Sequence, residues 1–274
     1  LTTARNAERD ASKNISRIDL SPDGERLVVS ARGDVFSLPS ETGITRNLTR
    51  SSNAHDRNAI WSPCGKHIAY LSDKSGEFEI YLKTQDGSSE AIQLTKDADT
   101  YYFSLSWSPD GKYILFNDKK MRLRYVDVAT KEIFEVIQSK IWEITDFSWS
   151  NDSKWISYTN PEENGLSTIK LYSLENKKTF EVTDYWYRSY SPTFSKDNKY
   201  LFFISDRDFN PTYSRTEWNH SYSKMSRVYF VNLSKDTPNP LSPKNNEVKI
   251  SKIDTTKETN KKDNKKADKS EKTK

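Results

Sequence analysis

A four-residue turn recurs along this chain at nearly constant spacing. Its clearest copy, Ser108-Pro109-Asp110-Gly111, lies between the apolar stretches 105–107 and 113–116. Proline presets φ at the second turn position and glycine accepts the positive φ that ends such a turn, so the stretch predicts a β-hairpin. Related turns begin at residues 21, 62, 150 and 195, which gives spacings of 41, 46, 42 and 45 residues. A repeat of this length with strand-forming flanks predicts a β-propeller.

The repeats divide further into short strand-forming segments. In the third repeat these segments are 104–108, 113–117, 123–128 and 133–137, and the other repeats have similar ones. The fifth repeat offers 191–195, 200–205 and 227–233, with 239–242 as a weak fourth strand. We therefore predict an all-β fold with about five four-stranded propeller blades over residues 15–243. Residues 1–14 show no pattern and are interpreted as the end of a preceding segment.

A large apolar residue precedes the turn serine in every repeat. Hydrophobic residues make up only 34% of the chain while aromatic residues reach 12%, so much of the core must be aromatic. We expect the pre-turn residues to pack between neighbouring blades, and the alternative is a row of rings that stacks a ligand. The residues concerned are Leu20, Trp61, Trp107, Trp149 and Phe194.

The fifth repeat contains a connection of about twenty residues between two predicted strands, far longer than its counterparts. Long connections in compact domains are usually functional or disordered, and this one is too aromatic for simple disorder. Arg207, Phe209, Tyr213 and Trp218 are therefore the candidate binding residues, and we expect the connection to pack against another part of the chain or a partner.

The net charge of +4 arises from the end of the chain. Residues 244–274 contain eleven lysines and six acidic residues, so the remaining residues sum to −1. That segment has no aromatic residue and too little apolar surface to offset the entropy lost on ordering, so it is predicted to be a disordered, lysine-rich linker. A nearly neutral body argues against a nucleic-acid partner.

Chemistry-bearing motifs are sparse. The chain has no Gly-x-Ser-x-Gly elbow and no glycine-rich phosphate loop, and His55, His67 and His220 lack zinc-ligand spacing. The single cysteine, Cys64, replaces the aspartate of one turn and is interpreted as a surface thiol. No apolar run approaches the roughly 18 residues of a membrane helix. We therefore predict no catalytic residue, metal or cofactor in this chain, and no membrane partner.

Three stretches beyond the repeat core carry a family resemblance. They are residues 31–39 (ARGDVFSLP) with 46–49 (RNLT), residues 68–73 (IAYLSD) with 76–81 (GEFEIY), and residues 205–213 (SDRDFNPTY). The repeat core resembles that of propellers of the TolB and tricorn type, and the three stretches together resemble the second propeller of the tricorn protease family. The resemblance covers nearly all of residues 15–243, and it implies that the five predicted blades form part of a seven-bladed propeller.

The resemblance implies a role that the residues alone do not. It implies a non-catalytic propeller segment of a serine peptidase that degrades oligopeptides, gating or guiding peptide substrates and products. It also implies PDZ and protease domains downstream in the same chain, a homo-oligomer when complete, and a cytoplasmic location, with the periplasm as an alternative. None of the family's catalytic motifs has a counterpart here. Two alternatives stay open, a stand-alone TolB-like protein-binding propeller and the propeller cap of a prolyl-oligopeptidase-like hydrolase.

Overall fold

The computed structural model describes residues 12–213, 220–243 and 247, and apart from one 3-10 turn (η1, Ser12–Asn14) its regular elements are β-strands. The predicted all-β class is confirmed. The described part of the chain contains no helix with the length and hydropathy of a membrane span. Contact density separates residues 1–237 from residues 238–274, and each of these two units is described by itself.

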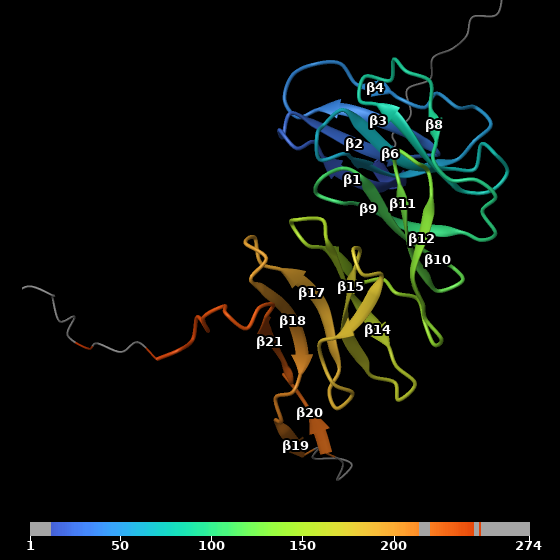
Figure 1. The fold of residues 1–274 in the computed structure, drawn as a ribbon. Helices are drawn as coiled ribbons and strands as arrows, with labels where there is room; N and C mark the ends of the chain where they lie inside the picture. The colour runs from blue at the N-terminus through green and yellow to red at the C-terminus, as the bar shows by residue number, and fades with distance from the viewer. Residues whose placement is uncertain (1–11, 214–219, 244–246, 248–274) are drawn as a thin grey trace, which may run out of the picture. The chain divides into compact units, whose positions relative to one another are not determined.

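Four antiparallel sheets of four strands follow one another along the first unit, and Figure 1 colours them from blue to yellow. The first contains β1 (Ile15–Leu20), β2 (Arg26–Ala31), β3 (Asp34–Pro39) and β4 (Arg46–Asn47). The second contains β5 (Asp56–Trp61), β6 (His67–Ser72), β7 (Glu79–Thr84) and β8 (Ile92–Gln93). The third contains β9 (Tyr102–Trp107), β10 (Tyr113–Asp118), β11 (Arg122–Asp127) and β12 (Ile133–Gln138). The fourth contains β13 (Phe147–Trp149), β14 (Trp155–Pro161), β15 (Ser167–Ser173) and β16 (Lys178–Glu181).

The fifth blade differs from this pattern and corrects the prediction of a fourth strand at 239–242. Its sheet has three strands, β17 (Ser189–Phe194), β18 (Tyr200–Asp206) and β21 (Ser226–Asn232). Residues 239–242 form a turn in the second unit, where the Ser242 amide donates to the Asn239 carbonyl over 3.1 Å. The predicted linker at 244–274 lies outside the described residues except for Glu247.

The recurring turn is held by one set of hydrogen bonds. In the third blade Ser108 Oγ donates to Asp110 Oδ1 over 2.7 Å, and the Lys112 amide donates to the same oxygen over 3.1 Å. Gly111 has a φ of 73°, which is why glycine ends the turn here. The same aspartate contacts recur in the turns that begin at residues 21, 150 and 195, and the exposed Cys64 takes the aspartate's place in the second blade.

The pre-turn apolar residues pack against the preceding blade, which confirms the predicted packing for four of the five. Trp61 joins Val28 and Val35 of the first blade in one buried cluster. Trp149 joins residues of the third blade, Phe194 joins residues of the fourth, and the half-buried Trp107 packs on residues of the second. Consecutive blades are therefore joined through these side chains.

Leu20 is the exception, and the prediction for this residue is wrong. Its side chain is 54% exposed and its neighbour Ile18 is 55% exposed, although the corresponding Trp61 and Ala59 of the second blade are buried. The reason is that no described blade precedes the first. The face of β1 that would contact a preceding blade is therefore uncovered.

The fifth blade leaves its opposite face uncovered. Phe202 and Ala69 each lie seven residues after the turn serine of their blade, so the two positions are equivalent. Val228 and Ile80 are equivalent because each pairs with the residue nine positions after that serine. Ala69 and Ile80 are fully buried against the third blade, whereas Phe202 is 38% and Val228 is 70% exposed. No hydrophobic cluster of the described residues joins the fifth blade to the first.

These two uncovered faces predict that the chain associates with itself. Contiguous exposed apolar surface on a sheet favours contact with another copy. We expect sedimentation velocity to give a size that increases with protein concentration, and Val228→Lys to weaken the association without lowering the melting temperature. Ile80→Lys, the matched change at the buried position of the second blade, should instead unfold the chain. A monomer at every concentration would contradict this prediction.

Candidate functional site

Antiparallel pairing places two kinds of connection at the same end of the blades. The turn between the second and third strands of a blade meets the connection that leads from its fourth strand to the next blade. We call this end the loop face, and it includes residues 94–101, 119–121, 139–146, 162–166, 182–188 and 207–213. The repeated Ser-Pro-Asp-Gly turns lie at the opposite end.

Exposed aromatic side chains are concentrated on the loop face. Trp142 is 70% exposed and Trp186 is 81% exposed, both on connections between blades. No exposed aromatic residue lies on the described turns at the opposite end. The loop face therefore has the composition typical of a binding surface, where rings supply contact area at low cost in side-chain entropy. The exposed aromatic residues of this face are Tyr101, Trp142, Tyr185, Trp186, Tyr187, Phe209, Tyr213 and Tyr222.

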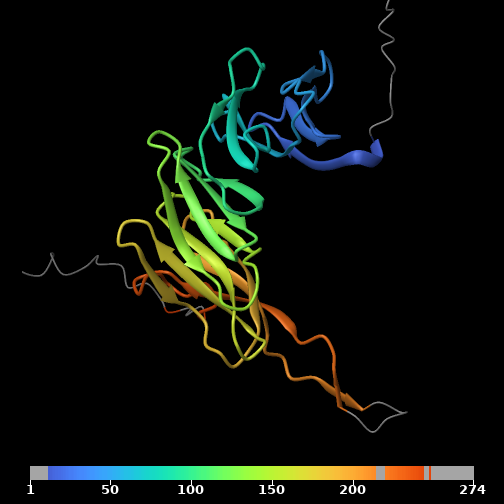
Figure 2. The same ribbon diagram turned by 90° about the vertical axis from the view of Figure 1, so that its right-hand side faces the viewer.

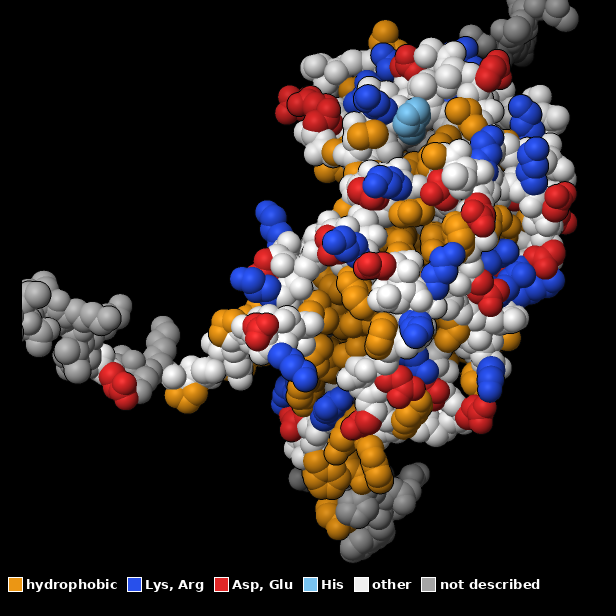
Figure 3. All heavy atoms as spheres, in the orientation of Figure 1, with side chains coloured by type: hydrophobic (Ala, Val, Ile, Leu, Met, Phe, Trp, Pro, Cys, Tyr) orange, Lys and Arg blue, Asp and Glu red, His pale blue; other side chains and the backbone are white. Residues whose placement is uncertain are grey.

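The long connection of the fifth blade forms a two-stranded ribbon, β19 (Pro211–Tyr213) with β20 (His220–Tyr222). Both ribbon views show the ribbon extending away from the sheet of β18 and β21 (Figures 1 and 2). Hydrophobic side chains gather over it in the space-filling view (Figure 3). Phe209 is 71% and Tyr213 is 70% exposed, and the centroids of the Phe209 and Tyr222 rings lie 5.5 Å apart. Packing of this connection against another part of the chain or a partner stays a prediction. Trp218 lies outside them.

Arg207 occupies a different environment from the other predicted binding residues. Its Nε donates to Ser205 Oγ over 2.9 Å, and its guanidinium carbon lies 5.4, 5.9 and 5.3 Å from the ring centroids of Tyr187, Phe203 and Tyr229. These contacts attach the base of the ribbon to the fifth blade through cation–π interactions. Arg207 thus positions the ribbon, and direct contact between Arg207 and a ligand stays a prediction.

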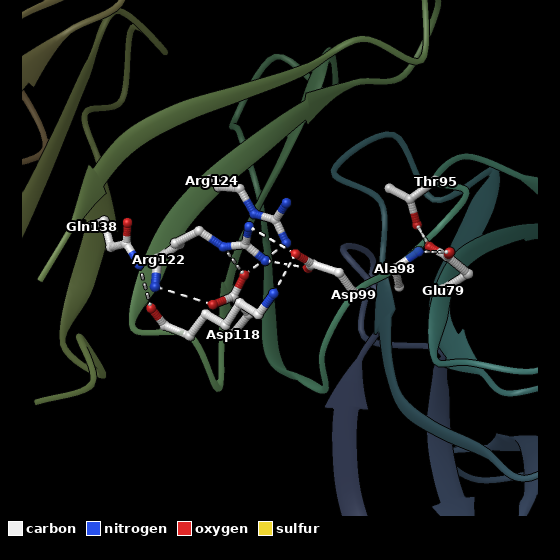
Figure 4. Close-up of polar contacts among 9 residues, drawn as sticks. Glu79, Thr95, Ala98, Asp99, Asp118, Arg122, Arg124 and Gln138 are labelled. Carbon is white, nitrogen blue, oxygen red and sulfur yellow. Dashed lines mark hydrogen bonds and ion pairs between the residues drawn. The ribbon is translucent and has the colours of Figure 1, made fainter.

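An ion-pair network fills the loop face of the third blade (Figure 4). Asp118 is fully buried, and its Oδ2 accepts hydrogen bonds from Arg122 Nε over 2.8 Å and from Arg124 Nη2 over 2.7 Å. Arg122 Nη2 also reaches Asp99 Oδ1 over 2.5 Å, and Lys120 Nζ reaches Asp99 Oδ2 over 2.6 Å. Hydrogen bonds from Arg122 and Lys120 hold the pKa of Asp99 below its usual range. The two carboxylates therefore enclose the Arg122 guanidinium.

The loop face of the fourth blade contains a cavity of about 470 Å³. Its polar groups surround Glu162. Glu162 Oε1 accepts hydrogen bonds from Asn160 Nδ2 and Thr168 Oγ1, each over 2.7 Å, and lies 3.3 Å from Lys170 Nζ. Burial raises the pKa of Glu162, but the hydrogen bonds from Thr168 and Asn160 and the charge of Lys170 outweigh it, so this pKa lies below its usual range. The carboxylate is therefore ionised at neutral pH.

Tyr185 forms the edge of this cavity. Its hydroxyl donates to Glu181 Oε1 over 2.6 Å, and this hydrogen bond raises the pKa of Tyr185 to about 12. Sequence reasoning missed Trp142, Glu162, Tyr185 and Trp186, because they lie in short connections and belong to no recognised motif. The one available signal was the clustering of aromatic residues in the connection at 185–187.

No candidate metal site is visible in the part of the chain that the structure describes. Its His, Cys, Asp and Glu residues include no group of three or more that could hold a metal ion. His55 packs edge-on against Phe78, and the side chain of His220 is not among those described.

The profile of the tricorn protease second beta propeller domain matches residues 15–272. This chain belongs to that family. The tricorn protease of Thermoplasma volcanium is 28% identical over 275 residues, which cover 81% of this chain and 27% of that protein. Tricorn protease homolog 1 of Streptomyces coelicolor is 24% identical over 78% of this chain and 21% of its own length. The predicted family is thus confirmed, and the chain spans about a quarter of these relatives.

Solved structures agree on the fold of this tricorn-family propeller. A crystal structure of the tricorn protease superposes with a TM-score of 0.76 at 21% identity, covering 86% of this chain and 24% of that one. A TolB structure from Agrobacterium tumefaciens superposes with a TM-score of 0.55 at 18% identity, covering 80% of this chain and 77% of that one. Identities this low support the propeller fold and carry no information on activity.

Proposed function

We propose that this chain is the non-catalytic propeller segment of a tricorn-like serine peptidase and that it guides oligopeptides to or from the catalytic domain. The observation that carries the proposal is the family match over residues 15–272, joined to a loop face rich in exposed rings. Oligopeptides suit such a face because their side chains can stack on Trp142 and Trp186 while extended backbone passes over the connections. The propeller would contribute selection and the remainder of the protein would contribute the chemistry.

The proposal implies partners that the chain does not contain. Further blades would cover Leu20 at one end and Val228 at the other, and PDZ and protease domains would follow in the complete product of the reading frame. The complete protein would form a homo-oligomer and work in the cytoplasm, with the periplasm as the alternative compartment.

The first test asks whether the 274-residue chain has peptidase activity of its own. We expect the purified 274-residue chain to hydrolyse no fluorogenic peptide, whereas the complete product of the reading frame should hydrolyse oligopeptides. Turnover by the 274-residue chain that is lost on changing one of its own residues would contradict a non-catalytic role.

A second candidate function is a stand-alone protein-binding propeller. It is favoured by the TolB likeness, which extends over most of the TolB chain. The two functions differ in what the reading frame encodes. A sequenced reading frame without a protease domain, together with capture of a folded protein by the aromatic loop face, would support the second candidate and exclude the first.

A further inference from the structure

The third and fourth blades have equivalent positions that carry different side chains. Phe116 pairs with Arg124 in the third blade, and Tyr158 pairs with Lys170 at the same distance from the turn serine in the fourth. Two residues beyond each pair, Asp118 therefore corresponds to Asn160 and Arg122 corresponds to Thr168. On the preceding connection, the buried Tyr102 and Ile144 correspond, so Asp99 corresponds to Ile141.

These replacements remove a guanidinium and two carboxylates from the equivalent positions of the fourth blade. In the third blade Arg122 is held between Asp99 and Asp118 (Figure 4). In the fourth blade a threonine stands in place of that arginine. Ile141, Asn160 and Lys170, the counterparts of Asp99, Asp118 and Arg124, line the open cavity of about 470 Å³.

The cavity keeps a carboxylate whose second oxygen is available. All three donors to Glu162 reach Oε1, and no hydrogen bond among the described residues reaches Oε2. Glu163 adds a second carboxylate to the lining. Lys170 lies 3.3 Å from Glu162 and 3.7 Å from Glu181. Glu162, Glu163 and Glu181 together carry three negative charges, against the two positive charges of Lys140 and Lys170, so one negative charge is left in excess at the cavity.

We propose that this cavity binds the cationic nitrogen of a peptide, a basic side chain or a free amino terminus. The Glu162 carboxylate accepts hydrogen bonds from that nitrogen through Oε2, as Asp118 accepts them from Arg122 in the third blade. Ile137, Ile141 and the Tyr185 ring contact the attached carbon chain. The choice of a peptide as carrier rests on the proposed function, whereas the preference for a cation rests on the cavity alone.

The test measures binding of three small peptides to the 274-residue chain by calorimetry. The probes are acetyl-Ala-Arg-Ala-amide, Ala-Ala-Ala-amide with a free amino group, and acetyl-Ala-norleucine-Ala-amide. We expect the first or second peptide to bind and the norleucine peptide not to bind, and the responding probe identifies the source of the cation. Glu162→Gln should weaken this binding about tenfold or more, because a charge-assisted hydrogen bond is lost.

Two further variants make the result decisive. Glu175→Gln alters an exposed glutamate on the β15–β16 turn at the opposite end of the same blade and should leave binding unchanged. Lys140→Ala removes the opposing charge and should tighten binding, and because this side chain is exposed the change should not affect folding. Equal binding of the arginine and norleucine peptides, an unchanged affinity in Glu162→Gln, or weaker binding in Lys140→Ala would overturn the proposal.

Failure here is distinguishable from failure of the proposed function. A cavity that binds none of the three peptides overturns the cation site, while guidance by the loop face is judged separately from hydrolysis by the complete protein. Equal binding of the charged peptides and the norleucine peptide would exclude the cation site and would leave the proposal of peptide guidance untouched.

Discussion

Replacing Asp118 by alanine is expected to lower the free energy of unfolding by about 3–5 kcal/mol, since removal of one partner leaves buried charges uncompensated. The Asp118 side chain is fully buried, and the side chains of Arg122 and Arg124 are only 15% and 12% exposed. Both guanidiniums would lose their hydrogen bonds to Asp118 while they stay largely buried. Denaturant melts of the variant measure the loss.

Asp99→Ala supplies the matched control in the same network. The Asp99 side chain is 48% exposed although it contacts both Lys120 and Arg122. Exposed ion pairs contribute about 0–1 kcal/mol, so this variant should be destabilised far less than Asp118→Ala. Equal losses in the two variants would show that burial of Asp118 does not decide its contribution.

Trp149→Ala should also lower the free energy of unfolding by about 3–5 kcal/mol, here because the loss of the indole leaves a cavity in the core. The indole is 8% exposed, its ring lies 6.2 Å from that of Tyr113 and 6.4 Å from that of Tyr125, and its Nε1 donates to the Ser106 carbonyl over 3.3 Å. Truncation would open a cavity at the contact between the third and fourth blades.

Trp142→Ala is the control for this change. Trp142 lies seven positions earlier on the connection that leads to the same blade and is 70% exposed, so its removal should alter stability by about 0.5 kcal/mol or less. Chemical denaturation of both variants compares the two sites directly. A loss in Trp142→Ala as large as that in Trp149→Ala would contradict the assignment of core and loop face.

The repeat and its turn chemistry could be predicted from sequence because they are local. A serine and an aspartate two residues apart bond to each other, and glycine ends the turn, whatever lies elsewhere in the chain. The four complete blades follow from this regularity. The family could also be predicted, since stretches such as 205–213 are specific enough to identify it.

The exceptions depend on contacts between blades, which local patterns do not encode. Leu20 has the same local pattern as Trp61, but its burial requires a preceding blade. The weak strand predicted at 239–242 is not part of the sheet of the fifth blade, which consists of β17, β18 and β21. The long connection was recognised as aromatic, but its pairing as a ribbon depends on register rather than composition.

The candidate site was predictable only in part. Phe209 and Tyr213 were found because their connection is unusually long, and the structure places both at the surface of the ribbon. The cavity beside Glu162 could not be found from the sequence. It is lined by Ile141 and Asn160, the counterparts of Asp99 and Asp118, and only the folded structure brings these positions together.

The central claim, that the loop face guides peptides in a tricorn-like peptidase, is tested most directly by blocking that face in the complete protein. A cysteine at the exposed position of Trp142, in a Cys64→Ser background, can carry a bulky label attached through a disulfide. We predict that the label reduces hydrolysis of a long oligopeptide several-fold, leaves hydrolysis of a single-residue amide unchanged, and loses its effect on reduction. Equal inhibition of both substrates, or of neither, would contradict the claim.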